Sequence, residues 1–465
     1  MRKKLIACIL TAAMLSMCMG CGNDSGASQG KGEENQAEEA SSDTQAEGDE
    51  NVNAEVSEEA EGEADAEASE GSQLSGEIHV ASWNASADGL AEIAEKFMEL
   101  HPGTTVIVDK VDAEYTKLYP ALASGVNVPD VMQIQQTDIQ AFLNNYEGSF
   151  ADVTDIVEPE KDNFAASAVS VALGSDGKYY GIPWDIGPCA MMYRKDVFEE
   201  AGVDVATIKT WDDFLEAGKV ILDKTGKKMF GFCYNGASSS DAVKLFLHQQ
   251  GGTYYDADGK VDLTTDKMLK GIAFLKEMQD AGITMDLPSE WDDRITALNA
   301  DQLVCLPYPV WYTGTLMSSV EGQSGKWGIA PMPSFDGEGG EVSMGGCVLA
   351  ISANSENLEL AKAYTAYAMM DNEANEINFK WGQFPSYTPS YEADAFKQVD
   401  EYFGVSRGEI FTKLVNSPSI DFGPYFTDVD QSMRTAIGDI FVNGADPETA
   451  LSEAAEAAQR IIDAK

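Results

Sequence analysis

Residues 181–196 read GIPWDIGPCAMMYRKD, and the interpretation of the fold starts from this stretch. Trp184 and Asp185 stand between Pro183 and Gly187, and an apolar run that ends in Tyr-Arg-Lys-Asp follows them. The pattern predicts a strand that ends at the Trp-Asp pair and a second strand over CAMMYRKD. A core strand needs no such pair, and an exposed loop gains little from an indole ring. We therefore expect the pair either to pack within the fold or to form the wall of a ligand site.

Strands and helices alternate in the part of the chain that precedes this stretch. The strand patterns cover 77–83, 104–111 and 131–134, and the helical patterns cover 90–102, 113–125 and 137–146. Thr137 or Asp138 is suited to cap the third helix. Such alternation predicts a parallel sheet with helices on both faces, and ligands of such sheets bind beyond the carboxyl ends of the strands.

Polar and aromatic pairs stand where these three strands end. The pairs are Trp83-Asn84, Val111-Asp112 and Gln135-Gln136. The first and third are candidate ligand contacts, although Trp83 could also serve as an aromatic cover for the edge of the sheet. After residue 186 a second series of strands and helices follows, and from Asn357 the chain is mainly helical. The sequence thus predicts two α/β domains with a helical C-terminal section.

Composition excludes several classes of function. The 465 residues carry a formal net charge of -47, and no basic stripe that could neutralise phosphates is present, so a nucleic-acid partner is not expected. The chain has three His and seven Cys with no CxxC pair, and neither a metal site nor a cofactor is expected. Four Cys lie alone in apolar surroundings, where free buried thiols are favoured over disulfides, namely Cys189, Cys233, Cys305 and Cys347.

The N-terminus has the layout of an export signal. Arg2, Lys3 and Lys4 precede a short apolar run that is too short to span a membrane, which predicts a signal peptide over residues 1–20. Cys21 follows Gly20 in a lipobox-like context, although Cys18 occupies a position where Leu, Val or Ile is usual; an ordinary cleaved signal is the alternative. Residues 21–76 are then expected to form a lipidated Cys followed by a disordered acidic tether, since their composition cannot bury enough apolar surface to fold.

Aromatic residues stand beside acids or amides at several further places. A sugar presents apolar C–H patches, which aromatic rings contact, and a rim of hydroxyls, which carboxylates and amides bind. Trp184-Asp185, Trp291 with Asp293, and Trp311-Tyr312 match this combination, and Trp381 is a further candidate at the entrance side. The alternatives are a core role for Trp311 and a turn cap or hinge ion pair for Asp185. The sequence predicts a carbohydrate site without enzymatic activity, because no catalytic motif accompanies it.

An ordered set of segments carries a resemblance to a known family. They include GEIHVASWN, LASGVNVPDVMQI, YYGIPWDIGPCAMMYRKDVFEEAG, VWYTGTL, KWGIAPMP, MGGCVLAIS and DPETALSEAAEAAQRI. Together they resemble carbohydrate-binding lipoproteins of bacterial ABC importers, the maltose-binding type of extracellular solute-binding protein. The resemblance implies a two-lobed, class II periplasmic-binding-protein fold with hinge crossovers and a sugar held between the lobes.

The resemblance also implies boundaries and partners. The first lobe is expected to comprise 77–185 plus 331–390, and the second 186–330 plus 391–465. The chain would leave the first lobe after Asp185 and return near residues 331–346, whose glycines would supply mobile backbone.

In such proteins Trp311 would stack on the sugar, and Gly345-Gly346 would allow a close backbone approach near the cleft. The expected protein is a monomer, anchored by Cys21 to the outer face of the cell membrane, that delivers sugar to a permease. Binding of another solute such as a peptide, or an exported glycosidase, are the alternatives.

Overall fold

The computed structural model describes residues 74–419 and 423–465, all within one compact unit, Glu70–Lys465. The predicted signal peptide, the lipidated Cys21 and the tether up to residue 73 lie outside the described residues. Within the described ranges, none of the helices combines the length and apolar composition that crossing a membrane requires.

The first lobe is built on a five-stranded sheet with the order β2-β1-β3-β10-β4. Its strands are β1 (Gly76–Ser82), β2 (Thr104–Lys110), β3 (Val131–Gln135), β4 (Ile182–Pro183) and β10 (Cys347–Ile351). β1 runs parallel to β2 and β3, whereas β10 runs antiparallel to β3 and β4. The carboxyl ends of β1, β3 and β4 therefore lie at the same edge of the sheet as the start of β10. The predicted ligand contacts Trp83-Asn84 and Gln135-Gln136 lie at this edge.

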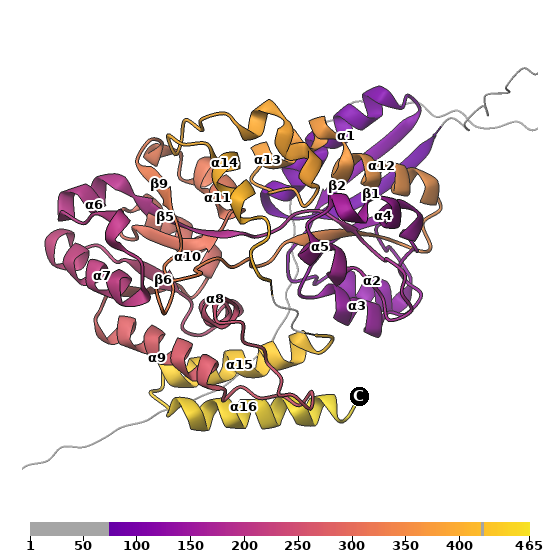
Figure 1. Cartoon of the computed structure of the whole chain (residues 1–465). Helices are drawn as coiled ribbons and strands as arrows, with labels where there is room; N and C mark the ends of the chain where they lie inside the picture. The colour runs from indigo at the N-terminus through magenta and orange to yellow at the C-terminus, as the bar shows by residue number, and fades with distance from the viewer. Residues whose placement is uncertain (1–73, 420–422) are drawn as a thin grey trace, which may run out of the picture. The chain divides into compact units, whose positions relative to one another are not determined.

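Helices cover this sheet as the alternation predicted. They are α1 (Asn84–Leu100), α2 (Leu118–Ser124), α3 (Ile139–Asn145), α4 (Thr154–Glu160), α5 (Ala166–Val171), α12 (Leu358–Met370) and α13 (Asn372–Lys380). Within the predicted helical range 90–102, Leu90, Ile93 and Phe97 of α1 recur at helical spacing, are buried and pack with Ile78 and Val80 of β1. Figure 1 shows α1 and α12 beside β1 and β2.

The second lobe contains two smaller sheets, with the orders β8-β5-β9 and β6-β7. Their strands are β5 (Cys189–Arg194), β6 (Phe230–Phe232), β7 (Thr284–Asp286), β8 (Cys305–Pro309) and β9 (Trp327–Ala330). The helices are α6 (Lys195–Ala201), α7 (Trp211–Thr225), α8 (Asp241–Gln249), α9 (Asp266–Asp280), α10 (Glu290–Asn299), α11 (Tyr312–Ser319), α15 (Phe426–Phe441) and α16 (Pro447–Ile462). Helix α14 (Arg407–Phe411) packs against both lobes, because Phe411 shares a cluster with Phe379 of the first and Val310 of the second. Thr210 and Asp213 form a capping box at the start of α7.

Short 3-10 helices complete the described secondary structure. They are η1 (Lys161–Asn163), η2 (Val205–Thr207), η3 (Glu321–Gln323), η4 (Thr388–Glu392), η5 (Asp394–Phe396) and η6 (Thr412–Leu414). The predicted helical C-terminal section is present, and α15 and α16 pack together against the core of the second lobe. In Figure 1 these two helices lie next to one another, with α15 beside α9 and below α8.

The chain passes from the first lobe to the second directly after Trp184, next to the predicted position after Asp185; we call this segment the outward crossing. Trp184 packs in the core of the first lobe and Cys189 in the core of the second, so the chain changes lobes across 185–188. Gly187 is required there because a Cβ atom on it would lie 1.8 Å from the carbonyl oxygen of Met344. Met344 N–H donates to the carbonyl oxygen of Gly187 over 2.8 Å. The outward and returning segments therefore run side by side.

The return crossing lies at the end of the predicted segment 331–346. Met332 and Val342 still belong to the core of the second lobe, and Cys347 is the first residue of the return to pack in the core of the first. The glycine-rich segment 337–340, which was expected to be mobile hinge backbone, is attached to the second lobe, since the Gln249 side-chain amide donates to Gly340 O over 2.9 Å. The first-lobe segment predicted as 331–390 thus begins near residue 347.

Candidate ligand-binding site

A chain of buried polar groups joins the strand ends to the crossing. Ser82 Oγ donates to Gln133 Oε1 over 2.6 Å, and Gln133 Nε2 donates to Cys347 Sγ over 3.2 Å. The backbone N–H of Cys347 donates to Asp185 Oδ1 over 2.7 Å, and Gln136 Nε2 donates to the backbone oxygen of Asp185 over 2.9 Å. These bonds connect β1, β3, β10 and the outward crossing into one unit.

Asp185 lies inside this unit rather than on a ligand wall. It is 2 % exposed, and burial raises the pKa of its carboxyl group to about 7. Gly346 lies directly against it, because a Cβ atom at this position would lie 2.4 Å from the backbone oxygen of Asp185. The close approach expected at Gly346 thus takes place between two segments of the chain. For Asp185 the geometry favours the hinge alternative over direct contact with a sugar.

Asp185→Asn should remove a pH dependence of stability. The folded pKa of Asp185 is raised above that of the unfolded chain, so the folded state binds the proton more tightly and loses stability as pH rises. Between about pH 5 and about pH 8 the wild-type chain should lose roughly 2–3 kcal/mol from this group, a loss that the Asn variant, with the same acceptor oxygen, lacks. Urea unfolding of both proteins across this range is the measurement. Parallel stability curves would contradict the assignment.

Two of the predicted tryptophans pack mainly within the first lobe. Trp184 is 1 % exposed and donates its indole N–H to Asn378 Oδ1 over 3.0 Å, which favours the packing alternative for this residue. Trp83 is 8 % exposed and lies edge-on to Tyr115, with ring centroids 5.6 Å apart.

Asn84 and Gln135 reach the solvent at the same edge. Asn84 is exposed, and its φ of 50° places it in the left-handed region, a strained conformation that is common at functional sites. Gln135 is half-buried and donates its backbone N–H to the Tyr115 hydroxyl over 2.8 Å. The first lobe thus offers two amide side chains beside an aromatic pair.

The second lobe brings four aromatic side chains together, which we call the aromatic platform: Trp291, Tyr308, Trp311 and Tyr312. Trp311 stacks on Trp291 with centroids 6.2 Å apart and planes 19° apart, and Tyr308 meets Trp311 edge-on at 5.2 Å. The Trp311 indole N–H donates to Met344 O over 3.3 Å, and Gly345 lies beside that nitrogen. Trp291 and Trp311 are only half-buried, whereas Tyr312 is fully buried behind them.

A buried ion pair supports the platform. Glu290 and Arg294, one turn apart on α10, pair with each other, and the Arg294 guanidinium lies 4.3 Å from the ring centroid of Tyr308. Burial raises the pKa of Glu290, and the charge of Arg294 lowers it. Among the described residues, Glu290 Oε2 and the hydroxyls of Ser239 and Ser240 have no hydrogen-bond partner although they are buried. Buried polar atoms are usually paired, so these atoms retain hydrogen-bonding capacity that the described residues do not use.

Asp138 is a candidate site residue that the sequence analysis considered only as a helix cap. It precedes α3, but its side chain makes no capping hydrogen bond. Burial raises its pKa to about 6, while the charges of Lys244 and Arg434 lower this pKa and that of Asp430 raises it. These three residues belong to the second lobe. The carboxyl group of Asp138, in the first lobe, therefore interacts electrostatically with charged side chains of the second lobe.

Two further predicted contacts, Asp293 and Trp381, already have hydrogen-bond partners within the protein. Asp293 accepts the backbone N–H of Ser289 over 2.7 Å and thereby satisfies the start of its own helix. Trp381 donates its indole N–H to Glu92 Oε2 over 2.8 Å and packs against α1. Over the ranges that the structure describes, no group of three or more His, Cys, Asp or Glu side chains is arranged to hold a metal ion.

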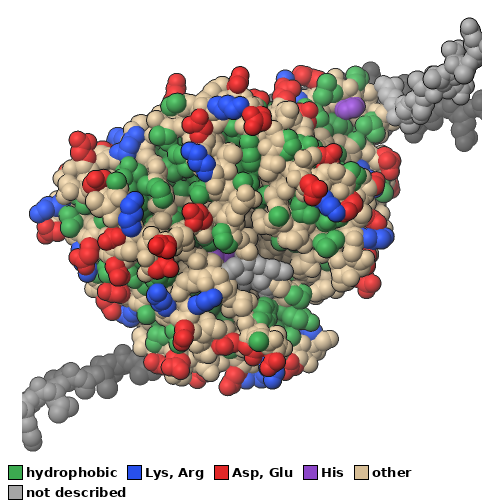
Figure 2. All heavy atoms as spheres, in the orientation of Figure 1, with side chains coloured by type: hydrophobic (Ala, Val, Ile, Leu, Met, Phe, Trp, Pro, Cys, Tyr) green, Lys and Arg blue, Asp and Glu red, His purple; other side chains and the backbone are tan. Residues whose placement is uncertain are grey.

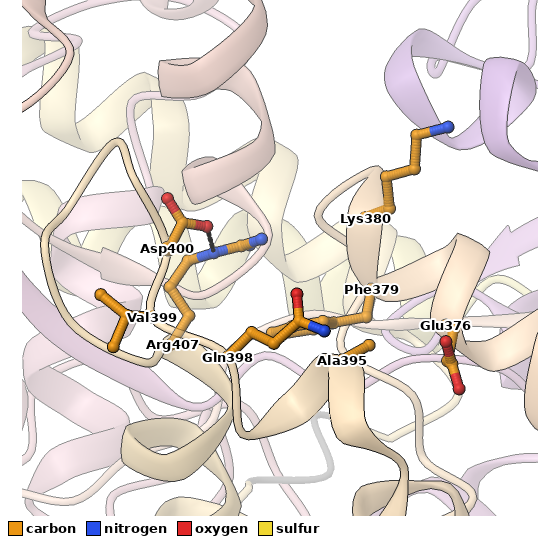
Figure 3. Close-up of a pocket in the computed structure, with 8 residues that line it drawn as sticks. All are labelled: Glu376, Phe379, Lys380, Ala395, Gln398, Val399, Asp400 and Arg407. Carbon is orange, nitrogen blue, oxygen red and sulfur yellow. Dashed lines mark hydrogen bonds and ion pairs between the residues drawn. The ribbon is translucent and has the colours of Figure 1, made fainter.

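A cavity of about 200 Å³ lies around Arg407 (Figure 3). Arg407 is 4 % exposed; its Nε donates to Asp400 Oδ2 and its Nη1 to Thr313 Oγ1, each over 2.8 Å. Phe379 lies 4.6 Å from the guanidinium. These contacts explain Arg407 as a structural group, so this cavity is not our candidate site.

Comparison with known proteins shows the family. The family of bacterial extracellular solute-binding proteins matches residues 81–369. The chain therefore belongs to this family, whose name describes exported proteins that bind solutes.

Relatives and solved structures agree with this assignment. The chain is 29 % identical over 360 residues to the arabinooligosaccharide-binding protein of Halalkalibacterium halodurans, covering 74 % of this chain and 79 % of that protein. It is 28 % identical to the lactose-binding protein of Rhizobium radiobacter, covering 77 % and 87 % of the two chains. A binding protein from B. animalis subsp. lactis Bl-04, solved in complex with beta-1,6-galactobiose, is 26 % identical with a TM-score of 0.72 and covers 83 % of this chain and 96 % of that one. The two-lobed fold that the sequence predicted is confirmed.

Proposed function

We propose that the chain captures an oligosaccharide between its two lobes and delivers it to the permease of an ABC importer. The observation that carries the proposal is the half-buried aromatic platform beside buried polar atoms without hydrogen-bond partners in the described structure. An aromatic face is suited to the C–H patches of a sugar ring, and the polar atoms are suited to its hydroxyls. The relatives named for arabino-oligosaccharides and lactose, and the galactobiose complex, support a sugar as the ligand.

Each lobe would supply part of the site. From the first lobe we propose Trp83, Asn84, Gln135 and Asp138. From the second we propose Ser239, Glu290, Trp291, Arg294, Tyr308 and Trp311. A sugar that touches both sets binds the closed arrangement of the lobes more tightly than an open one, and this difference in affinity shifts the population toward the closed state. The bound sugar is released unchanged, because capture needs no chemistry, metal or cofactor.

The proposal includes export and anchoring. Cys21 lies outside the described residues; acylated, it would hold the protein at the outer face of the cell membrane. The acidic segment that follows would act as the tether, and the protein would work as a monomer. Figure 2 shows acidic and basic side chains interspersed over the outer parts of one face, without a basic stripe there.

A thermal-shift screen tests the ligand class. The purified chain is heated with mono- and oligosaccharides, and with amino acids, peptides and metal ions for comparison. A ligand at a hundredfold excess over its dissociation constant stabilises the folded state by about 2.7 kcal/mol. We expect a rise in melting temperature with one class of saccharide. A rise with peptides and none with saccharides would identify the protein as a binding protein for another solute.

Asp138→Asn should weaken saccharide binding by about 10- to 100-fold, because it replaces charge-assisted hydrogen bonds with neutral ones. The wild-type affinity should fall as pH drops below about 6, where Asp138 takes up a proton, and the Asn variant should lack this dependence. Calorimetric titration across pH is the measurement. The matched control is Asp258→Asn, an exposed acid in a turn remote in sequence from the site residues. Equal affinity of wild type and Asp138→Asn would remove Asp138 from the site.

A further inference from the structure

Tyr115 has an unusual backbone conformation in the segment that follows β2. Its φ of 57° places a bulky aromatic residue in the left-handed region, where such residues are rare and strained. The segment begins with Val111-Asp112, a pair to which the proposed function gives no role, and Asp112 Oδ1 accepts the backbone N–H of Thr116 over 2.8 Å. Strained residues cluster at functional sites. The conformation of Tyr115 therefore points to a role for its side chain.

The Tyr115 ring packs against two aromatic residues of the first lobe. It lies edge-on to Trp83, with ring centroids 5.6 Å apart, and edge-on to Phe142, with ring centroids 5.0 Å apart. Edge-to-face pairs are a preferred and stabilising geometry for aromatic rings. Tyr115 is only 6 % exposed, so its ring supports the proposed sugar contact Trp83 from behind.

The Tyr115 hydroxyl lies beside the turn between β3 and α3. Gln135 donates its backbone N–H to the hydroxyl oxygen over 2.8 Å, and Asp138 donates its backbone N–H to the carbonyl oxygen of Gln135 over 2.9 Å. An N–H group can only donate, so the hydroxyl accepts this bond and its own proton remains available for another partner. The two bonds meet at Gln135, which places the hydroxyl next to the turn that carries Asp138.

The carboxyl group of Asp138 is the partner for this proton. A hydrogen bond from Tyr115 lowers the pKa of the Asp138 carboxyl, whereas burial raises it. Burial also raises the pKa of the Tyr115 hydroxyl well above its ordinary value, so the hydroxyl keeps its proton and can donate it. The Asp138 side chain makes no capping bond to α3. A carboxylate has two acceptor oxygens, so one can bind Tyr115 while the other binds a ligand.

We propose that Tyr115 is a positioning residue for the first-lobe part of the sugar site, where its ring orients Trp83 and its hydroxyl holds the carboxyl group of Asp138. The inference rests on the proposed function and extends it to a residue that lies behind the binding surface. The other titratable groups that act on Asp138, or on which Asp138 acts, stay in place when the Tyr115 hydroxyl is removed: Lys244, Asp430, Arg434, Tyr119 and Cys347.

Tyr115→Phe tests this role, because it removes the hydroxyl group and keeps the ring. Without the hydrogen bond to its charged form, the Asp138 carboxyl should bind its proton more tightly. We expect the pH below which the saccharide affinity falls, about 6 in the wild type, to rise by about one unit. At neutral pH the affinity should fall by about 3- to 10-fold. The measurement is calorimetric titration across pH with the saccharide selected from the thermal-shift panel of mono- and oligosaccharides.

A double substitution separates an effect through Asp138 from a general loss of packing. In the Asp138→Asn background, Tyr115→Phe should change the affinity by less than about twofold, because the carboxyl group on which the hydroxyl acts is gone. The matched control is Tyr364→Phe, which removes a buried first-lobe hydroxyl that donates to Leu90 O over 3.0 Å. This control should lower the melting temperature as Tyr115→Phe does and leave the affinity and its pH profile unchanged.

An unchanged pH profile in Tyr115→Phe would overturn the positioning role, whatever the change in affinity. An effect of Tyr115→Phe that persists in full in the Asp138→Asn background, or that Tyr364→Phe reproduces, would overturn it as well while leaving sugar binding intact. If the wild type binds no saccharide, the proposed function itself fails, and the role of Tyr115 in a sugar site fails with it.

Discussion

Trp311→Ala should lower the affinity for the bound saccharide by at least about 100-fold. Trp311 lies between Trp291 and Tyr308 and is held by its indole N–H bond to Met344 O, so its ring is presented in a fixed orientation. Aromatic residues at the centre of a binding site commonly contribute more than 2 kcal/mol, and alanine removes the whole ring. Calorimetric titration of the variant with the saccharide selected by the thermal-shift screen is the measurement.

Two further variants separate binding from folding. Trp311→Phe keeps an aromatic face and should retain part of the affinity. Tyr180→Ala removes an aromatic ring that donates to Asp176 near β4, far from the platform in sequence, and should leave the affinity unchanged. Wild-type affinity in Trp311→Ala, with the fold intact by circular dichroism, would show that the platform does not bind the sugar.

Asp400→Ala should lower the free energy of unfolding by about 3–5 kcal/mol. The carboxylate accepts from Arg407 over 2.8 Å, and Arg407 is 4 % exposed beside Phe379 (Figure 3). Removing one partner of a buried pair leaves the other charge desolvated and uncompensated. Urea unfolding measures the change.

The matched control is Asp280→Ala, which removes the acid of the exposed pair between Lys276 and Asp280 on α9. Exposed pairs contribute about 0–1 kcal/mol, so this variant should remain close to the wild type. If Asp400→Ala and Asp280→Ala lower the free energy of unfolding by the same small amount, the buried pair of Asp400 and Arg407 does not stabilise the fold as its burial indicates.

The sequence predicted the alternating elements of the first lobe, but the predicted parallel sheet is mixed, because β10 runs antiparallel to β3 and β4. The strand pattern before Trp83 and the spacing of Leu90, Ile93 and Phe97 predicted β1 and α1, because periodicity reports directly on burial. The start of the returning first-lobe segment, predicted at residue 331, was too early because the glycines at 337–340 resemble hinge backbone. Their attachment to Gln249 depends on a contact between residues far apart in the chain, which no local pattern contains.

The candidate site was only partly predictable, for a similar reason. Trp311 could be found because it follows a strand and opens a helix, whereas Asp138 has the same local context as an ordinary N-cap residue. Glu290 and Arg294 have the i, i+4 spacing of a common surface pair, and only the tertiary structure shows that they are buried. Trp184 and Asp185 satisfied the pattern of a sugar contact but are enclosed by the crossing segments.

Calorimetric titration of the purified chain with the oligosaccharide panel, followed by chromatography of the recovered sugar, tests the central claim most directly. We predict saturable binding of one saccharide class at one site per chain, recovery of that saccharide unchanged, and loss of the signal in Trp311→Ala. Saturable binding of a peptide with no response to any saccharide, or recovery of shortened sugars, would contradict the assignment of this protein as an oligosaccharide-binding component of an ABC importer.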